Sequence, residues 1–321
     1  MSNPTAPIEA SLKYSSKKVQ KKSLLKQISK DKYLLLLVAP AVLYFFIFKY
    51  IPMLGIIVSF KDYNPFLGFW DSEWVGLKYY RLFFHNPDSW EIIRNTFLLG
   101  VYKIIWGFPA PIILALLLNE LRFIIYKRIV QTISYLPHFI STVVVASMVT
   151  MFLSPTSGMV NEVIQYFGFK PINFLQEAGW FRSIYVTSEV WQDVGWGSII
   201  FLAALSGINP SLYEASSIDG ANRWKQMLHI TLPGLTPAIV ILLILNIGRM
   251  IDIGFEKVYL LANPATYETA DIISTYVYRV GLVQGNFSYG TAIDLFMGII
   301  SLIFVCSANY FSRKLTDNSL W

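Results

Sequence analysis

The chain has 321 residues, of which 55% are hydrophobic, 16% aromatic and only 14% charged. Because about 25% charged residues are usual in a soluble globular domain, this composition excludes a water-soluble protein and predicts a membrane protein. The formal charge of +6 alone would fit contact with nucleic acid or with an anionic membrane, so the placement of the charges has to decide. The single cysteine, Cys306, excludes an intramolecular disulfide and a cysteine-based metal cage.

The N-terminal 32 residues form a basic tail that carries eight lysines. An apolar run then extends from Tyr33 to Phe60 and contains one charge, Lys49. That length suits a spanning anchor rather than a cleaved signal peptide. We interpret the lysines as a topology signal and as an attraction to anionic lipid, and we expect no binding of nucleic acid.

Windows of about 20 apolar residues predict an all-α fold with six transmembrane helices. The predicted spans lie near 33–60, 96–118, 133–152, 184–205, 236–253 and 292–311. Six spans place both ends of the chain on the same side of the membrane. The predicted organisation is therefore a basic tail (1–32), one membrane domain (33–311) and a C-terminal tail (312–321).

The distribution of charge predicts on which side of the membrane both termini lie. The segments on the side of the N-terminus are 1–32, 119–132, 206–235 and 312–321, and they hold 15 Lys and Arg against 6 Asp and Glu. The rest of the chain holds 11 against 14. Since cytoplasmic segments carry an excess of Lys and Arg, we expect both termini in the cytoplasm of a cell-membrane protein. The outer loops, 61–95, 153–183 and 254–291, are long enough to receive a partner protein.

The cytoplasmic segment 206–235, between the fourth and fifth spans, differs sharply in composition from its flanks. We expect a short helix from Pro210 to about Asp219, with Ser211 as N-cap and Glu214 completing a capping box. Gly220 permits a turn that other residues resist. A second short helix, with Trp224, Met227 and Leu228 on one face, should then end at Pro233.

This segment closely resembles the coupling-loop signature of permease subunits of binding-protein-dependent (type I) ABC importers. The signature reads Glu-Ala-Ala, then Gly, then Ile-x-Leu-Pro. The residues that match are Glu214, Ala215, Gly220, Ile230, Leu232 and Pro233, and Ser216 replaces the second alanine. Further stretches resemble the oligosaccharide and polysaccharide branch of the sugar-importer permeases: 61–66, 95–96, 108–112, 115–120 and 134–138.

The resemblance implies the type I permease fold, with a family core over about 92–311. It implies import of a carbohydrate by alternating access, with the coupling loop seated on separate ABC ATPase subunits, Glu214 near the contact and Gly220 at its elbow. The other implied partners are a solute-binding protein outside the cell and a second permease, which is a different, homologous chain by resemblance to this branch.

The residues themselves also indicate that another subunit hydrolyses ATP. The chain contains no Gly-x-x-x-x-Gly-Lys-Ser/Thr phosphate loop. The three histidines, His85, His138 and His229, have no metal-ligand spacing and no nucleophile–base arrangement. We therefore expect no enzymatic activity, no cofactor and no metal.

Polar residues within predicted spans are candidates for the substrate pathway, because charges in a bilayer usually face a bundle interior or water. Asp193 and Trp196 share a helical face with Tyr185 and Glu189 in the fourth span. In the fifth span, we expect Asn246, Arg249 and Ile253 on one face. Aromatic rings pack against the C–H faces of sugars, and amides and carboxylates bind hydroxyls. The candidates for the substrate pathway are therefore Asp193, Trp196, Asn246 and Arg249.

Three alternatives stay open. Asp193 and Arg249 would form a structural ion pair rather than a pathway if they neutralise each other. The chain would be an ion-coupled secondary transporter if Glu189, Asp193 and Asp294 serve as cation sites, although such a carrier has no need of a coupling loop. A related alternative is an ABC importer for a solute other than a sugar, such as a peptide or a lipid.

Overall fold

The computed structural model describes residues 32–316. Apart from one short β-ladder, the elements in this part of the chain are helices, as the all-α prediction requires. The chain divides into two compact units between Gly55 and Ile56. The predicted N-terminal tail lies almost wholly outside the described residues, and the last part of the C-terminal tail, 317–321, does also.

The first predicted span is a helix with two segments that depart from α-helical geometry. Its elements are α2 (Lys32–Phe45), the π-helical turn η1 (Phe46–Tyr50), α3 (Ile51–Met53) and the 3-10 segment η2 (Leu54–Phe60). Residues Leu35–Phe60 are long and apolar enough to cross a membrane, which confirms the predicted 33–60 span.

Three further continuous helices reach membrane-spanning length: Ser89–Glu120, Arg223–Gly248 and Phe287–Lys314. The first joins α6 (Ser89–Tyr102), the π-turn η3 (Lys103–Gly107) and α7 (Pro109–Glu120). The second joins α13 (Arg223–Gln226), the π-turn η5 (Met227–Thr231) and α14 (Leu232–Gly248). The third is α18 (Phe287–Thr316).

Three of these π-turns stand just before a proline: η1 before Pro52, η3 before Pro109 and η5 before Pro233. A proline in an α-helix lacks an N–H and clashes with the carbonyl four residues earlier. A π-turn shifts the hydrogen-bond pattern by one residue: the Leu232 N–H, for example, bonds the Met227 carbonyl, five residues back. The helices therefore pass these prolines without ending.

One of the remaining two predicted spans is broken and the other is followed by a bend, so the described residues contain four continuous helices of spanning length, or up to six spans if each bent pair counts as one. The predicted 133–152 span is α8 (Ile124–Tyr135) with the 3-10 turn η4 (Leu136–Phe139), followed at 102° by α9 (Thr142–Phe152). Ser141 caps α9 by accepting from the Val144 N–H, and the Gln192 amide donates to the Ile140 carbonyl at 2.9 Å. These bonds satisfy the backbone at the break. The fourth span is α11 (Ala178–Ser206), bent by 70° from α12 (Pro210–Ile218).

The outer loops carry structure of their own, in short elements. The first contains the antiparallel strands β1 (Lys61–Asp62) and β2 (Glu73–Trp74), with Lys61 opposite Trp74 and Asp62 opposite Glu73, around α4 (Gly68–Asp71), followed by α5 (Lys78–His85). The second contains α10 (Met159–Tyr166). The third contains α15 (Phe255–Leu261), η6 (Pro264–Thr266), α16 (Tyr267–Ala270), α17 (Ile273–Val277) and the π-turn η7 (Tyr278–Val283).

A hydrogen-bonded carboxylate holds the first outer loop onto α5. The Tyr79 hydroxyl donates to Asp62 Oδ1 at 2.7 Å, and the Lys78 ammonium donates to Oδ2 at 2.9 Å. These two bonds hold the pKa of the Asp62 carboxyl below its usual value. Burial, followed by the bond to Asp62, raises the pKa of Tyr79 to about 12.

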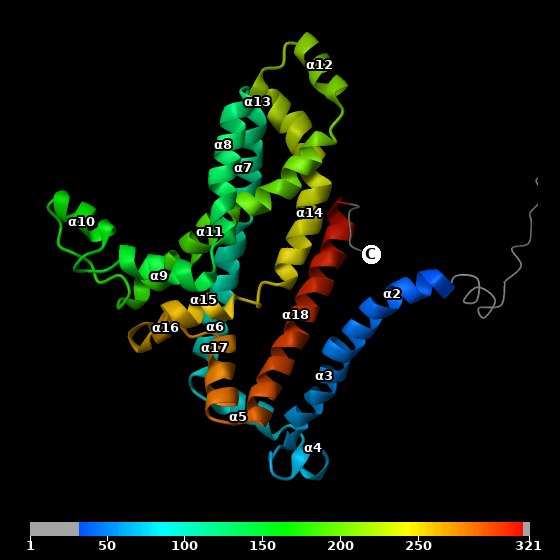
Figure 1. Ribbon diagram of the computed structural model, residues 1–321, viewed down its shortest axis with the longest axis vertical. Helices are drawn as coiled ribbons and strands as arrows, with labels where there is room; N and C mark the ends of the chain where they lie inside the picture. Colours follow the sequence, from blue (N-terminus) through cyan, green and yellow to red (C-terminus); the bar gives the residue numbers. More distant parts are fainter. Residues whose placement is uncertain (1–31, 317–321) are drawn as a thin grey trace, which may run out of the picture. The chain divides into compact units, whose positions relative to one another are not determined.

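Three apolar clusters form the core of the second unit. One joins α6, α11 and the third outer loop around Tyr185, which is fully buried. Another joins α5, α17 and α18 around Phe83. The third joins α7, α11 and α14 around Leu235. The helices α12 and α13 lie at one end of the long helices, whereas α5 and α17 lie at the other end (Figure 1).

Candidate functional site

The segment 206–235 forms a helical knob whose first helix is α12. Asn209 caps this helix, because its side-chain oxygen accepts from the Ser211 N–H at 3.0 Å. The predicted N-cap, Ser211, was wrong: Pro210 opens the helix, where its missing N–H costs nothing, and Ser211 is already helical. The expected capping box from Ser211 to Glu214 is therefore absent, while the helix ends at Ile218, one residue from the expected Asp219.

Gly220 makes the turn after α12, with φ at +75°. An added Cβ would meet nothing within 4 Å, so the backbone conformation, not the space, requires glycine here. The Ala221 N–H bonds the Ser216 carbonyl at 2.9 Å and closes the turn.

The second helix of the knob does not end at Pro233, which corrects the sequence prediction. The helix begins at Arg223, capped by Asn222, and continues through the π-turn η5 into α14. Since the π-turn relieves the clash of Pro233 with the preceding turn, the knob and the fifth span are one continuous helix. A displacement of the knob is therefore transmitted directly to that span.

Hydrogen bonds tie the two arms of the knob together. The Gln226 amide donates to the Ser216 and Ser217 hydroxyls at 3.0 and 2.9 Å. The Tyr213 hydroxyl and the Thr231 hydroxyl lie 3.0 Å apart. These bonds join α12 to the start of the fifth span, so the knob moves as one body.

An ion pair also links the knob to the end of the second span. The Arg223 guanidinium lies 3.0 Å from Glu120, at the last residue of α7. Both side chains are about half exposed, so the pair is a surface contact of modest strength.

The knob presents apolar side chains outward. Ile218 is 87% exposed and Trp224 is 70% exposed. Of the predicted coupling residues, four are exposed and two are half-buried: Glu214, Ala215, Gly220 and Pro233 are exposed, and Ile230 and Leu232 are half-buried. Exposed large apolar side chains on a short loop indicate a surface for another protein.

A polar cluster lies between the spans around Glu189 of α11. Its carboxylate is 3.7 Å from the Lys103 ammonium of the π-turn η3 and 3.2 Å from the Lys257 ammonium of α15. Lys257 is buried and also donates to the Gln192 side chain at 2.7 Å. One carboxylate thus joins the second span, the fourth span and the third outer loop.

Asp193 forms a second group, one turn further along α11. Asp193 Oδ1 lies 2.9 Å from His138 Nδ1 in the break of the third span. The His138 ring stacks on Trp196 with centroids 4.7 Å apart and planes 3° apart. Asp193 therefore pairs with His138, and the predicted alternative of an ion pair with Arg249 was wrong.

This arrangement depends on a close contact between α8 and α11. A Cβ added to Gly195 would lie 2.0 Å from the Ser134 carbonyl oxygen. Glycine is required here by the approach of the neighbouring backbone, and this approach brings His138 to Trp196.

Asn246 and Arg249 do not share a helical face, because α14 ends at Gly248 and not at the predicted residue 253. The chain turns there because it passes over α6, where a Cβ on Gly100 would lie 2.2 Å from the Met250 carbonyl oxygen. Asn246 lines a cavity with Lys103, Glu189 and Asp193. Arg249 is exposed and does not line that cavity.

Two cavities meet at Glu189 and Asp193. One, of about 520 Å³, is also lined by His138, Gln192, Phe255 and Lys257. The other, of about 220 Å³, is also lined by Lys103, Phe108 and Asn246. The two carboxylates line both hollows, and the arrangement offers aromatic faces, carboxylates and ammonium groups to a polar ligand.

Sequence reasoning missed three members of this site: His138, Gln192 and Lys257. His138 has no metal-ligand spacing and no nucleophile–base partner in the sequence, and Lys257 lies in an outer loop and not in a predicted span. Gln192 did carry a signal, because it stands three residues after Glu189 and one before Asp193 in a predicted span.

Comparisons with known proteins identify close relatives. The chain is 46% identical over 294 residues to Protein LplB of Bacillus subtilis (strain 168), covering 92% of each chain. It is 46% identical over 305 residues, covering 95% of each chain, to the polygalacturonan/rhamnogalacturonan transport system permease protein YteP of the same organism.

A solved structure has the same fold. The chain matches, with a TM-score of 0.87 and 40% sequence identity, a chain in the crystal structure of a bacterial alginate ABC transporter in complex with an alginate pentasaccharide-bound periplasmic protein. The match covers 93% of this chain and 100% of that chain. The predicted type I importer fold is thereby confirmed.

The family of this chain is shown by a match to a family model over more than half of its residues. Residues 107–317 match the family described as binding-protein-dependent transport system inner membrane component. The resemblance to sugar-importer permeases is thus confirmed, and the chain belongs to the family of binding-protein-dependent transport system inner membrane components.

Proposed function

We propose that this chain is a permease subunit of an ATP-driven importer that moves a carbohydrate, an oligosaccharide or a polysaccharide fragment, into the cell. The observation that carries the proposal is the rigid knob formed by α12, Gly220 and α13, which exposes Glu214, Ile218 and Trp224 and continues into the fifth span. ABC ATPase subunits bind this knob, and their closure tilts the attached helices. The chain itself catalyses no reaction.

The carbohydrate is proposed from the chemistry of the polar cluster and from the relatives. Trp196, 46% exposed, supplies an aromatic face for the C–H side of a pyranose. Asp193 and Asn246 supply groups for sugar hydroxyls. The substrates printed in the names of relatives, polygalacturonan and rhamnogalacturonan for one and alginate for another, are polysaccharides.

A second permease subunit is part of the proposal. The Asp193 side chain is 54% exposed in the single chain, although it belongs to the proposed pathway. A carboxylate and an indole open to this extent need another protein surface to enclose a water-filled passage. The resemblance to the polysaccharide branch favours a homologous rather than an identical partner, and a solute-binding protein delivers substrate at the outer loops.

The excess of positive charge on the segments 1–32, 119–132, 206–235 and 312–321 favours a cytoplasmic location for both termini and for the knob. Proteolysis of sealed, right-side-out vesicles tests this orientation. A tag on either terminus should be protected until the vesicles are opened.

The test of the function uses proteoliposomes that contain the purified complex and its binding protein. We expect uptake of labelled oligosaccharide to require ATP on the side of the knob and to be unaffected by a proton or sodium gradient. Uptake that follows an ion gradient without ATP would show a secondary transporter instead. Glu214→Ala should lower ATP-driven uptake several-fold.

A further inference from the structure

A groove on the outside of α11 combines one unpaired cation with a long apolar floor. The groove has a volume of about 870 Å³ and lies between the helices α6–α7 and α11. The α11 wall carries Arg182, Ser183 and Thr187 toward the start of the helix and Val190 and Trp191 further along. The facing wall consists of Tyr102, Ile105, Trp106, Pro109, Ala110 and Ile113.

Arg182 has no carboxylate partner among the described residues. Its Nη2 donates to the Asn95 side-chain oxygen at 2.9 Å, and its Nε is buried without a hydrogen-bond partner in the part of the chain that the structure describes. A guanidinium that is partly withdrawn from water and lacks a counter-ion favours an anionic ligand.

The depth of Arg182 matches that of a lipid headgroup. The helix α11 has 29 residues, so it is about 43 Å long and exceeds a hydrocarbon core of about 30 Å by several ångströms at each end. Arg182 is the fifth residue of this helix. It lies about 6 Å from the helix end, at the boundary between the polar headgroups and the acyl chains.

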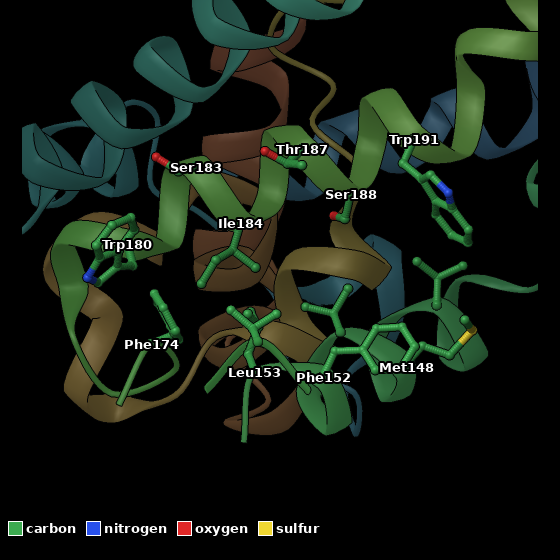
Figure 2. A pocket seen from close by; sticks show the side chains of 13 residues that line it. Met148, Phe152, Leu153, Phe174, Trp180, Ser183, Ile184, Thr187, Ser188 and Trp191 are labelled. Atoms are coloured by element: carbon green, nitrogen blue, oxygen red, sulfur yellow. The ribbon is translucent and has the colours of Figure 1, made fainter. Parts of the chain in front are cut away.

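The polar and apolar parts of the groove are separated along its length. The hydroxyls of Ser183 and Thr187 belong to the Arg182 end, and they point away from Phe152 and Leu153 of an adjoining apolar pocket, which Ser183, Thr187 and Trp191 also line (Figure 2). From Tyr102 to Ile113 the opposite wall is apolar or aromatic over about 16 Å. An oligosaccharide needs polar groups along its whole length, whereas a lipid has one polar end and a long apolar chain.

We propose that this groove binds an anionic phospholipid, with its phosphodiester at Arg182 and one acyl chain along Trp106 and Trp191. The lipid completes the hydrogen bonding of the guanidinium and covers the exposed rings, since Trp106 is 63% exposed and Trp191 is 43% exposed. It also fastens the second span to the fourth beside the cavity that Asn246 lines, since Val186 and Val190 line both that cavity and the groove. The site is independent of the transported substrate.

Quenching of tryptophan fluorescence by lipids with brominated acyl chains tests this site in the complete transporter, reconstituted in phosphatidylcholine nanodiscs. The signal from the groove is the difference between the wild-type complex and the Trp106→Phe, Trp191→Phe double variant. We expect brominated phosphatidylglycerol to bind about fivefold more strongly than brominated phosphatidylcholine, since one basic residue near the membrane surface contributes about 1 kcal/mol.

Three variants identify the cation. Arg182→Gln should abolish the preference for phosphatidylglycerol, whereas Arg182→Lys should keep most of it. Arg94→Gln removes an exposed arginine of α6 that does not line the groove, and it should leave the preference unchanged. A preference that survives Arg182→Gln overturns the assignment.

Two results with the wild-type residue at position 182 also overturn the proposal, so it does not depend on the stability of a variant. Equal quenching by the two lipids shows that the groove has no anion site. Absence of any difference between the wild-type complex and the double tryptophan variant shows that the second permease subunit, rather than lipid, covers the groove.

Discussion

The knob between the fourth and fifth spans and the polar cluster within the membrane differ in how their residues come together. The knob is built from one continuous stretch of chain, and its main contacts join residues within 206–235, as when Gln226 bonds Ser216 and Ser217. The cluster joins residues that are distant in sequence, such as His138 with Asp193 and Glu189 with Lys257. A local device tolerates small changes elsewhere, whereas the cluster depends on helix crossings and on breaks in helices.

We therefore expect the largest loss of uptake from a substitution at a helix crossing. Gly195→Val should separate α11 from α8, because a Cβ at this position lies 2.0 Å from the Ser134 carbonyl oxygen and that backbone cannot move aside cheaply. Overpacking of this kind costs about 3 kcal/mol, so we expect uptake to fall by more than about a hundredfold. The measurement is ATP-driven uptake in proteoliposomes at equal protein content.

Gly179→Ala is the matched control on the same helix, because an added Cβ there meets nothing within 4 Å. It should leave uptake unchanged. Wild-type uptake by the Gly195→Val variant would show that the contact between α8 and α11 does not position the cluster.

A smaller effect is expected at the elbow of the knob. Gly220→Ala places a side chain at a φ of +75°, which costs about 1–2 kcal/mol. We expect uptake to fall about fivefold or more, with the binding of sugar to the cluster unchanged, because only the docking of the ATPase is altered. The measurement pairs uptake with co-purification of the ATPase subunit.

Gly285→Ala provides the control for backbone strain, since Gly285 has a φ of +74° in an outer segment. If both variants lose uptake equally, the loss reflects instability and not coupling. Loss confined to Gly220→Ala supports the role of the elbow.

The sequence predicted the knob better than the cluster for a physical reason. Turn and helix signals such as Pro210 and Gly220 act over a few residues, so the α12 helix and the turn could be located within one or two positions. Even there, the cap was assigned to Ser211 although Asn209 holds it. The prediction that Pro233 ends the second helix of the knob was also wrong, because a π-turn lets the helix continue.

The cluster could be predicted only in part. Helical spacing correctly grouped Asp193 and Trp196, but it assumed a straight helix to residue 253 and so placed Arg249 beside Asn246. The break in the third span, which brings His138 to Trp196, depends on the close approach at Gly195 and on the Gln192 bond to Ile140. Contacts across helices of this kind have no periodic signal in a single sequence.

A third substitution removes the aromatic ring of Trp196 from the polar cluster. Trp196→Ala should raise the KM for oligosaccharide about fivefold, because an aromatic contact contributes about 1 kcal/mol, while ATPase assembly stays intact. Trp196→Phe should retain most of the affinity. Phe123→Ala serves as a control, because Phe123 is a 69% exposed ring between α7 and α8 and lines neither cavity of the cluster. An unchanged KM with several oligosaccharides would remove Trp196 from the pathway.

The smallest effect concerns the link between the knob and the second span. Arg223 and Glu120 are about half exposed, so solvent screens their attraction and the pair contributes about 0.5 kcal/mol. A double-mutant cycle tests this pair with the variants Arg223→Gln, Glu120→Gln and both together. The measurements are thermal unfolding of the purified complex and uptake at low and high salt. We expect each single variant to lower uptake less than twofold, with a difference that vanishes at high salt. A coupling energy of several kcal/mol would mean that the knob transmits motion through α7 as well as through the continuous helix that leads into α14.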